Sequence, residues 1–253
     1  MQADLAWLGL AWDAVERQSD RVEAHAGALD QLADAGLLYP CECSRREIAA
    51  MGIRAPDGGW RYPNRCRERA LPGGGWREAS GVLRVRLPDR ETGPRDESGL
   101  ALALNVPRAF GDPVVRRRDG SVAYHLASVV DDRASQVTRI VRGRDLATTT
   151  ATQVALQEQL GYPTPRYRHH LLLLEERGEK LAKLHGAVGA QELRRAYTAE
   201  ALCGFLAYTA GLSAKPIPTT PAELLRDFDW QRVRGDDCVV RWGGRELSLV
   251  SRA

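Results

Sequence analysis

Residues 136–174 read QVTRIVRGRDLATTTATQVALQEQLGYPTPRYRHHLLLL, and this stretch decides the fold class. Its opening, residues 136–141, is rich in β-branched residues and predicts a strand. Residues 148–150 can cap a helix that stops at Gly161. Residues 167–174 are mostly apolar, which is typical of a buried parallel strand. Strand, helix and strand in this order predict an α/β unit with its ligand loops at the ends of the strands.

The segments on either side of this unit have simpler patterns. A strand is predicted at residues 113–117, and the turn at Asp119 and Gly120 predicts a hairpin into a second strand at residues 122–130. Beyond residue 186 the spacing of apolar residues predicts mainly helices. A chain of 253 residues with these elements is long enough to bury a core without disulfide support.

The bulk composition narrows the class of protein without naming a function. A net charge of +3 is too small to indicate a nucleic-acid binder by itself. No export signal begins the chain, and no apolar run approaches the ~20 residues that span a bilayer. We therefore expect a cytoplasmic protein with no membrane partner.

Three of the five cysteines are crowded around a stretch rich in glycine and proline. Cys41 and Cys43 form a C-x-C pair, and Cys66 follows Tyr62 in a Tyr-x3-Cys pattern. Three thiolates can occupy three tetrahedral positions on Zn²⁺ at about 2.3 Å, and an oxygen or nitrogen ligand would complete the site. The alternative is three unrelated cysteines in a reduced protein. The spacing favours the metal, which would also order residues 52–80.

Two of only three lysines in the chain lie close together, at Lys180 and Lys183. They follow the predicted strand and an acidic turn. Lysines on a mobile loop can bind ATP phosphates and stabilise charge that moves onto pyrophosphate. Two lysines alone are more commonly part of a solvated surface, so this motif is informative only in its context.

A third motif begins with residues 124–132, YHLASVVDD, and continues in VRGRD at residues 141–145. Taken alone, Tyr124 reads as a core residue and Arg142 as a surface charge. Four histidines, His125, His169, His170 and His185, are expected to be structural, with satisfied hydrogen bonds. Several arginines, among them Arg84 and residues 116–118, can face RNA phosphates or simply solvent.

Together the three motifs resemble those of the glutamyl-Q tRNA(Asp) synthetases, a class I family related to the glutamyl-tRNA synthetases. The resemblance implies that a zinc ion is held by four side chains, Cys41, Cys43, Tyr62 and Cys66. It also implies that Tyr124 and Arg142 bind glutamate, as a phenol and a guanidinium can.

Residues 180–184, KLAKL, resemble the KMSKS signature of class I synthetases. The resemblance implies that Lys180 and Lys183 act in catalysis and that Lys183 contacts ATP. Ala182 departs from the family pattern, which has a serine at this position. That difference bears on closure of the loop and leaves its location unchanged.

The resemblance implies an α/β fold, a class I Rossmann-like catalytic domain that is incomplete at its N-terminus. Residues 1–37 are expected to complete the first half of this domain, and residues 38–112 to form a zinc-bearing acceptor-binding insertion. Residues 113–190 would form the second half with the KMSKS-like loop. Residues 191–253 would form a short, mainly helical C-terminal part.

The expected function is a ligase that activates glutamate with ATP, with Mg²⁺, and transfers it to queuosine of tRNA(Asp). We expect a monomer with a structural zinc ion. Because the family's HIGH-type ATP motif is absent from these 253 residues, impaired activity is expected. Two alternatives remain open, a non-catalytic zinc module that binds RNA or a partner, and a fragment of a glutamyl-tRNA synthetase.

Overall fold

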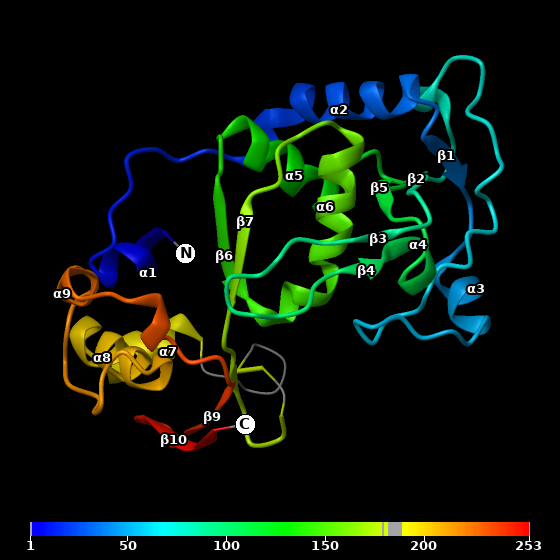
Figure 1. The fold of residues 1–253 in the computed structure, drawn as a ribbon. Coiled ribbons are helices and arrows are strands. Elements are labelled where there is room, and N and C mark those ends of the chain that lie inside the picture. The colour runs from blue at the N-terminus through cyan, green and yellow to red at the C-terminus, as the bar shows by residue number, and fades with distance from the viewer. Residues whose placement is uncertain (1, 179, 182–188, 253) are drawn as a thin grey trace. The chain divides into compact units, whose positions relative to one another are not determined.

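The computed structural model describes residues 2–178, 180–181 and 189–252 (Figure 1). The chain forms two compact units, each built from segments that are separate in sequence. The larger unit contains Glu16–Arg142 and Leu146–His169. The smaller unit contains Met1–Val15, Gly143–Asp145 and His170–Ala253. The polypeptide therefore passes from one unit to the other four times.

The larger unit contains an antiparallel sheet and several helices. Its strands are β1 (Leu38–Cys41), β2 (Val82–Val85), β3 (Glu91–Thr92), β4 (Leu104–Asn105) and β5 (Val114–Arg116). Its helical elements are η1 (Gln18–Arg21), α2 (Val22–Asp34), α3 (Arg45–Ala50), η2 (Trp76–Glu78), α4 (Val106–Ala109), α5 (Tyr124–Ala134) and α6 (Thr150–Gln159). Strands β1, β2 and β5 form one sheet in the order β1-β2-β5, and β3 pairs with β4.

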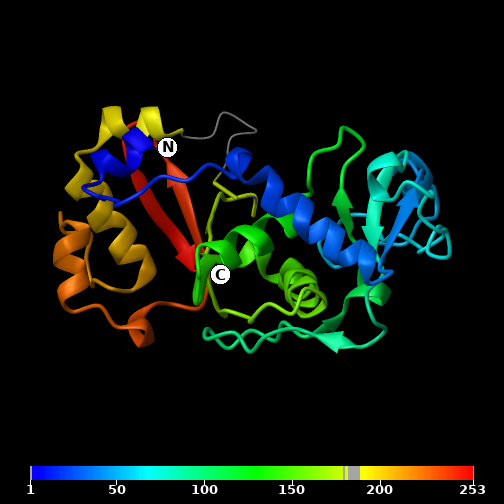
Figure 2. The ribbon, with the colours of Figure 1, turned by 90° about the horizontal axis from the view of Figure 1, so that it is seen from above.

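The core of the larger unit lies between these helices and the three-stranded sheet. Helix α2 contributes Leu29 and Leu32, which are almost completely buried, and it packs against α5 (Figure 2). Strand β2 contributes Val85 opposite Leu38 of β1, so that both side chains enter the same core. The apolar face of each helix thus packs against the apolar face of the sheet. Burial of these side chains stabilises the larger unit.

The strand, helix and strand predicted within residues 136–174 are present, but the strand predicted at 167–174 is broken. It ends at His170, and Leu173–Leu174 form a separate strand, β8, in another sheet. Strands β6 (Arg139–Gly143) and β7 (Arg166–His170) form a two-stranded sheet, and η3 (Arg144–Thr149) and α6 connect them. Leu156 of α6 is fully buried. Arg142 and Gly143 therefore occupy the end of a strand, where an α/β unit places its ligand loops.

The prediction of a strand at residues 122–130 is wrong. The turn after β5 does form a short hairpin, with Arg116 bridged to Val122, but the chain then enters α5 at Tyr124. The buried residues of this helix have helical spacing: Leu126, Ala127, Val129 and Val130. The turn at Asp119 and Gly120 suggested a strand after it, but packing of one helical face decided the outcome.

The smaller unit combines helices with a second sheet. Its elements are α1 (Gln2–Trp7), β8 (Leu173–Leu174), α7 (Ala190–Ala196), α8 (Ala199–Ala210), α9 (Pro221–Arg226), η4 (Trp230–Arg232), β9 (Cys238–Trp242) and β10 (Leu247–Arg252). The strands are ordered β10-β9-β8. Leu202 and Phe205 of α8 pack with Val240 and Leu247, and Trp7 of α1 packs against this cluster. Among the helices in the described part of the chain, none has the length and apolar character to cross a membrane.

Candidate metal centre and active site

Strand β1 and the loop that follows α3 bring three thiols and a phenol together. The sulfur atoms of Cys41, Cys43 and Cys66 all lie within 4.8 Å of one another. Cys43 Sγ is 3.6 Å from Cys66 Sγ, and Cys41 Sγ donates to the Tyr62 hydroxyl at 3.4 Å. Cys41, Tyr62 and Cys66 are at most 3% exposed. The four side chains therefore form one cluster, in which only Cys43 is partly exposed.

The geometry and chemistry of this cluster fit a divalent metal ion. Sulfur atoms at about 2.3 Å from a tetrahedral ion lie about 3.8 Å apart, close to the distance between Cys43 and Cys66. Burial, Cys66 and Cys41 together raise the pKa of the Cys43 thiol to about 12, and burial likewise raises the pKa of Tyr62. Such crowded groups cannot all lose their protons unless a cation compensates the charge.

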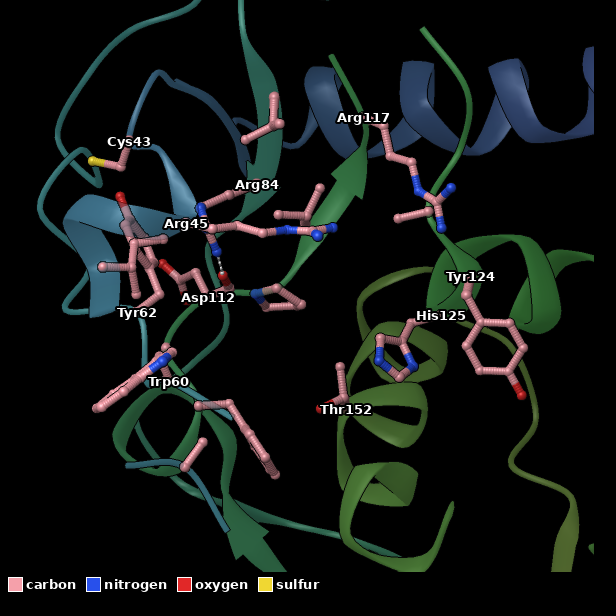
Figure 3. Close-up of a pocket in the computed structure, with 18 of the residues that line it drawn as sticks. Cys43, Arg45, Trp60, Tyr62, Arg84, Asp112, Arg117, Tyr124, His125 and Thr152 are labelled. Carbon is pink, nitrogen blue, oxygen red and sulfur yellow. Dashed lines mark hydrogen bonds between the residues drawn. The ribbon is translucent and has the colours of Figure 1, made fainter. Parts of the chain in front are cut away.

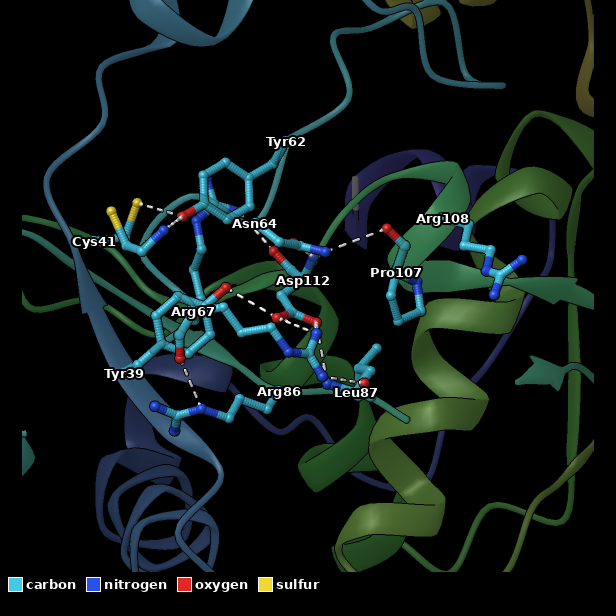
Figure 4. Close-up of polar contacts among 12 residues, drawn as sticks. Tyr39, Cys41, Tyr62, Asn64, Arg67, Arg86, Leu87, Pro107, Arg108 and Asp112 are labelled. Atoms are coloured by element: carbon cyan, nitrogen blue, oxygen red, sulfur yellow. Dashed lines mark hydrogen bonds and ion pairs between the residues drawn. The ribbon is translucent and has the colours of Figure 1, made fainter. Parts of the chain in front are cut away.

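A buried carboxylate supports the loop that carries Cys66 (Figure 4). Asp112 is fully buried and accepts hydrogen bonds from Arg67 Nη1 at 2.7 and 2.6 Å, one to each oxygen. It also accepts from the Tyr39 hydroxyl at 3.0 Å and from the Leu87 backbone at 3.1 Å. Burial raises the pKa of Asp112, and these bonds oppose that effect. The residue after Cys66 is thereby fixed to strand β1.

A close backbone contact places Tyr62 in this cluster. The Tyr62 N–H donates to the Phe110 carbonyl at 2.8 Å. Gly111 follows with a φ of 80°, and a Cβ atom there would lie 2.1 Å from the Tyr62 carbonyl oxygen. Only glycine meets both demands, the left-handed backbone and the close approach. The segment before β5 is therefore shaped to accept the phenol-bearing loop.

A cavity of about 820 Å³ lies in the larger unit beside the metal cluster. Residues of the cluster and its surroundings line one side (Figure 3), among them Cys43, Trp60 and Tyr62. Tyr124 and Thr152, from α5 and α6, line the other side. A cavity of this size with aromatic and polar walls is a default candidate for a ligand site.

Arg142, at the end of β6, is held by three neutral side chains. Its Nη1 donates to Gln153 Oε1 at 2.6 Å and its Nη2 to Thr150 Oγ1 at 2.6 Å. Its Nε lies 3.1 Å from His169 Nε2. The guanidinium also lies 5.2 Å from the centre of the Tyr167 ring. The sequence alone did not indicate that Arg142 is part of a network, because its partners lie 8 to 27 residues away.

Tyr124 begins α5 and is 45% exposed, so it is not the core residue that its pattern suggests in isolation. His125 follows it, and burial together with the charge of Arg142 lowers the pKa of this imidazole. That effect shows that Arg142 lies near the start of α5. The expectation that every histidine has satisfied hydrogen bonds is wrong for His125, whose buried Nδ1 has no hydrogen-bond partner among the described residues.

Lys180 lies in the smaller unit beside β8, bridged to Leu174. Its ammonium forms an ion pair with Asp145 Oδ2 at 2.5 Å. Burial alone would raise the pKa of Asp145, but the ion pair with Lys180 outweighs burial and the pKa is lowered. Asp145 ends the VRGRD motif. Lys183 and Ala182 lie outside the described residues, and their roles stay predictions.

Two of the arginines that the sequence suggested as RNA contacts form hydrogen bonds inside the protein instead. Arg84 is 7% exposed, donates to the Asp112 carbonyl at 2.6 Å and lies 3.5 Å from the centre of the Tyr62 ring. Arg116 is 8% exposed and donates to the Ala79 carbonyl at 2.6 Å. These two charges belong to the interior of the larger unit. Arg117 and Arg118 line the cavity.

Comparison with known proteins identifies the class to which this fold and site belong. Residues 1–214 match the family model described as tRNA synthetases class I (E and Q), catalytic domain.

Two solved structures share the fold. A glutamate-tRNA synthetase from Elizabethkingia anophelis has a TM-score of 0.70 at 23% identity, over 92% of this chain and 55% of that chain. A glutamate tRNA ligase from Elizabethkingia meningosepticum, solved in complex with its amino acid, has a TM-score of 0.67 at 21% identity. The chain spans about half the length of these structures. It belongs to the class I tRNA synthetases (E and Q), a family of ligases.

Curated relatives give a finer likeness. A glutamyl-Q tRNA(Asp) synthetase from Symbiobacterium thermophilum is 42% identical over 248 residues, which is 91% of this chain and 76% of the relative. The glutamyl-Q tRNA(Asp) synthetase from Deinococcus radiodurans is also 42% identical, over 88% of this chain and 76% of the relative. The resemblance stated from the motifs is therefore confirmed at the level of whole sequences.

Proposed function

We propose that the protein activates glutamate with ATP and transfers it to queuosine of tRNA(Asp). The observation that carries the proposal is the cavity lined on one side by Cys43 and Tyr62 and on the other by Tyr124. It joins the expected acceptor-binding insertion to an expected glutamate-binding residue within one unit. The relatives from Symbiobacterium thermophilum and Deinococcus radiodurans, named for this reaction, support it.

In this proposal Arg142 and Tyr124 bind glutamate. A guanidinium held in a fixed plane can pair with a carboxylate through two parallel hydrogen bonds, and a phenol hydroxyl adds a directional bond. The neutral partners Gln153 and Thr150 hold Arg142 without adding negative charge. The arrangement thus supports recognition of an anionic amino acid.

Lys180 and Lys183 are proposed to bind ATP and to stabilise the leaving pyrophosphate, with Mg²⁺ bound to the nucleotide. Adenylate formation depends on positioning and charge stabilisation, which flexible ammonium groups supply. The ion pair of Lys180 with Asp145 supports this proposal, because it anchors one of the lysines to the VRGRD motif.

We further propose that Cys41, Cys43, Tyr62 and Cys66 hold a structural Zn²⁺ ion. The close packing of the sulfur atoms and the Tyr62 hydroxyl supports this choice. Zinc would supply a fixed tetrahedral junction between β1 and the loop of residues 52–80. A monomer acting in the cytoplasm, where ATP and tRNA are present, completes the proposal.

The test begins with glutamate-dependent exchange between ATP and labelled pyrophosphate, run with and without tRNA. Exchange should need no tRNA, and in whichever of the two chains below shows exchange, the Arg142→Lys variant should raise the KM for glutamate more than that for ATP. Glu97→Gln, a change at an ion pair with Arg139, is the matched control. The assay is repeated on a chain with additional N-terminal sequence, which tests the expected impairment.

Transfer is then measured with three acceptors: tRNA(Asp) carrying queuosine, tRNA(Asp) lacking it, and tRNA(Glu). Glutamate should be transferred to the first acceptor alone. Transfer to tRNA(Glu) would instead indicate a fragment of a glutamyl-tRNA synthetase. Zinc binding without exchange or transfer in either chain would indicate a non-catalytic module.

A further inference from the structure

A buried hydrogen-bonded chain leads from Asp96 through His169 to Arg142 in the larger unit. His169 Nδ1 lies 2.6 Å from Asp96 Oδ2, and both side chains are fully buried. On the opposite edge of the ring, His169 Nε2 lies 3.1 Å from Arg142 Nε. Asp96 comes from the loop after β3, which bridges to Tyr167 of β7. Three segments that are distant in sequence therefore meet at one imidazole.

Hydrogen bonds on both edges of the ring select one tautomer of His169. Arginine has donors only, so the hydrogen bond from Arg142 Nε requires an unprotonated Nε2 on His169. Thr150 Oγ1 lies 3.1 Å from the same nitrogen, and its hydroxyl can donate there. The proton of the neutral ring then sits on Nδ1 and is donated to Asp96. Asp96 is suited to accept it as a carboxylate. Burial alone would raise its pKa, but hydrogen bonds from Ser98 and His169 lower the pKa below its ordinary value.

The neutral imidazole of His169 helps to orient the guanidinium of Arg142. His169 Nε2, Thr150 Oγ1 and Gln153 Oε1 each accept a hydrogen bond from a different nitrogen of the guanidinium, which fixes its plane. Imidazole in the Nδ1–H form does this without adding a negative charge. A carboxylate placed directly against Nε would orient the arginine equally well and cancel part of its charge. Burial raises the pKa of the neighbouring Asp132 carboxyl, and Arg142 opposes that rise.

We propose that Asp96 and His169 are positioning residues that orient Arg142, and through it the carboxylate of glutamate. Asp96 selects the tautomer of His169, and that tautomer presents the acceptor that Arg142 requires. The part that concerns glutamate rests on the function proposed above. Neither residue needs to touch the substrate, and both are placed too deep to do so.

Substitution of Asp96 by asparagine should reverse the tautomer. Asp96 Oδ1 accepts from the Ser98 backbone N–H at 2.8 Å, and the Ser98 hydroxyl bonds to the same oxygen. A backbone N–H can only donate, so the amide oxygen of an asparagine must face Ser98 and its NH2 group must face His169. The ring would then accept at Nδ1 and carry its proton on Nε2, directed at the Nε–H of Arg142. The Nε2–H would bond to Thr150 Oγ1, which lies 3.1 Å away, and Arg142 Nε would face a donor in place of its acceptor. The guanidinium would then be held by two acceptors in place of three.

The first measurement is NMR of the full chain with ¹⁵N-labelled histidine and arginine, without substrate. Wild type should show His169 as the Nδ1–H tautomer and a slowly exchanging Arg142 Nε–H, and Asp96→Asn should show the Nε2–H tautomer and lose that signal. The control is Glu97→Gln in the same loop, whose carboxylate pairs with Arg139. An unchanged tautomer in Asp96→Asn would overturn the proposal.

The second measurement is the KM for glutamate in pyrophosphate exchange. Asp96→Asn should raise it roughly tenfold to hundredfold, as a displaced substrate-binding group does, and leave the KM for ATP within about twofold. His169→Gln places an amide oxygen near the position of Nε2 and should retain more activity than His169→Ala. In the His169→Gln background, Asp96→Asn should have little further effect, because no tautomer remains to be reversed.

The outcomes separate this proposal from the function on which it rests. A reversed tautomer with an unchanged KM for glutamate would overturn the positioning role. Equal effects of Asp96→Asn in the wild-type and His169→Gln backgrounds would also overturn it, since they would indicate loss of stability alone. If wild type shows the Nδ1–H tautomer and the Arg142 signal, but glutamate-dependent exchange is absent both from this chain and from the chain with additional N-terminal sequence, the orientation of Arg142 is supported and the proposed function is contradicted.

Discussion

Asp112 shows how much one buried side chain contributes to the stability of the larger unit. Asp112→Ala removes the acceptor for Arg67 and for the Tyr39 hydroxyl and leaves a partly buried guanidinium without its counter-charge. Removing one partner of a buried pair costs about 3–5 kcal/mol, so we expect a loss of that size in the free energy of unfolding. Urea denaturation followed by circular dichroism measures it.

The control for this prediction is Asp89→Ala. Asp89 pairs with Arg108 through bonds of 2.7 Å, but both side chains are more than half exposed. Exposed ion pairs contribute little because water and salt screen them. A loss at Asp89 equal to that at Asp112 would contradict the importance assigned to burial.

At the scale of single residues, the sequence predicted the group of cysteines but not the hydrogen-bond partners that lie far apart in the chain. The cysteine spacing correctly brought Cys41, Cys43 and Cys66 together, and their role as zinc ligands stays a prediction. The contact between Asp96 and His169 spans 73 residues and could not be predicted, because neither residue belongs to a short motif. A pairing of that kind depends on how a loop returns to a strand, which periodicity does not report.

At the scale of elements, Gly111 controls how the loop bearing Tyr62 meets the segment before β5. Gly111→Ala would place a methyl group against the Tyr62 carbonyl and strain a backbone with a φ of 80°. We expect a lower melting temperature and weaker zinc retention, measured by competition with a chromogenic chelator.

Gly120→Ala is the matched control for Gly111→Ala. Its φ is 85° but its Cβ has open space, so only backbone strain of about 1–2 kcal/mol should appear. Equal zinc retention in both variants would argue against this role for Gly111.

Asp30 of α2 accepts hydrogen bonds from Trp76 and Arg77 of η2, so we expect the stability of this contact to depend on pH. Hydrogen bonds from Arg77 and Trp76 lower the pKa of Asp30 from 3.8 to about 2. The folded state therefore favours the carboxylate, and its stabilising effect is complete above about pH 4 and lost as the pH falls towards 2. The chemical shift of the Trp76 indole N–H should titrate with a midpoint near pH 2. In Trp76→Phe, the carboxyl carbon of Asp30 should titrate closer to 3.8, and a wild-type midpoint already at 3.8 would refute the prediction.

Elements with strong periodic patterns were predicted well, and one with mixed signals was not. In residues 136–174 a strand, a helix and a strand form, although the second strand ends at His170. Ser44 caps α3 with a capping box to Glu47. Helix α5 was mistaken for a strand because the turn at Asp119 and Gly120 predicted a hairpin into it. Burial of Leu126 and Val130 on one helical face outweighed that local signal.

At the scale of the whole molecule, the metal cluster lies entirely within the larger unit. Removing zinc with a chelator should therefore speed amide exchange in residues 52–80, and exchange in α8 should not change. Hydrogen–deuterium exchange with mass spectrometry measures both regions at once. Cys43→Ser should reproduce the effect, and Cys203→Ser, at a lone buried thiol in α8, is the matched control. Unchanged exchange in residues 52–80 would contradict a structural role for the metal.

The interleaving of the two units affects how the protein is made. Synthesis on the ribosome completes the larger unit once His169 has emerged, but α1, which precedes that unit in the chain, packs in a cluster with Leu202 and Phe205. Helix α1 must therefore wait until the partners that follow residue 170 are made, several seconds at ~5–20 residues per second, with Trp7 exposed to chaperones and proteases. A segment made before the larger unit thus reaches its final place after it.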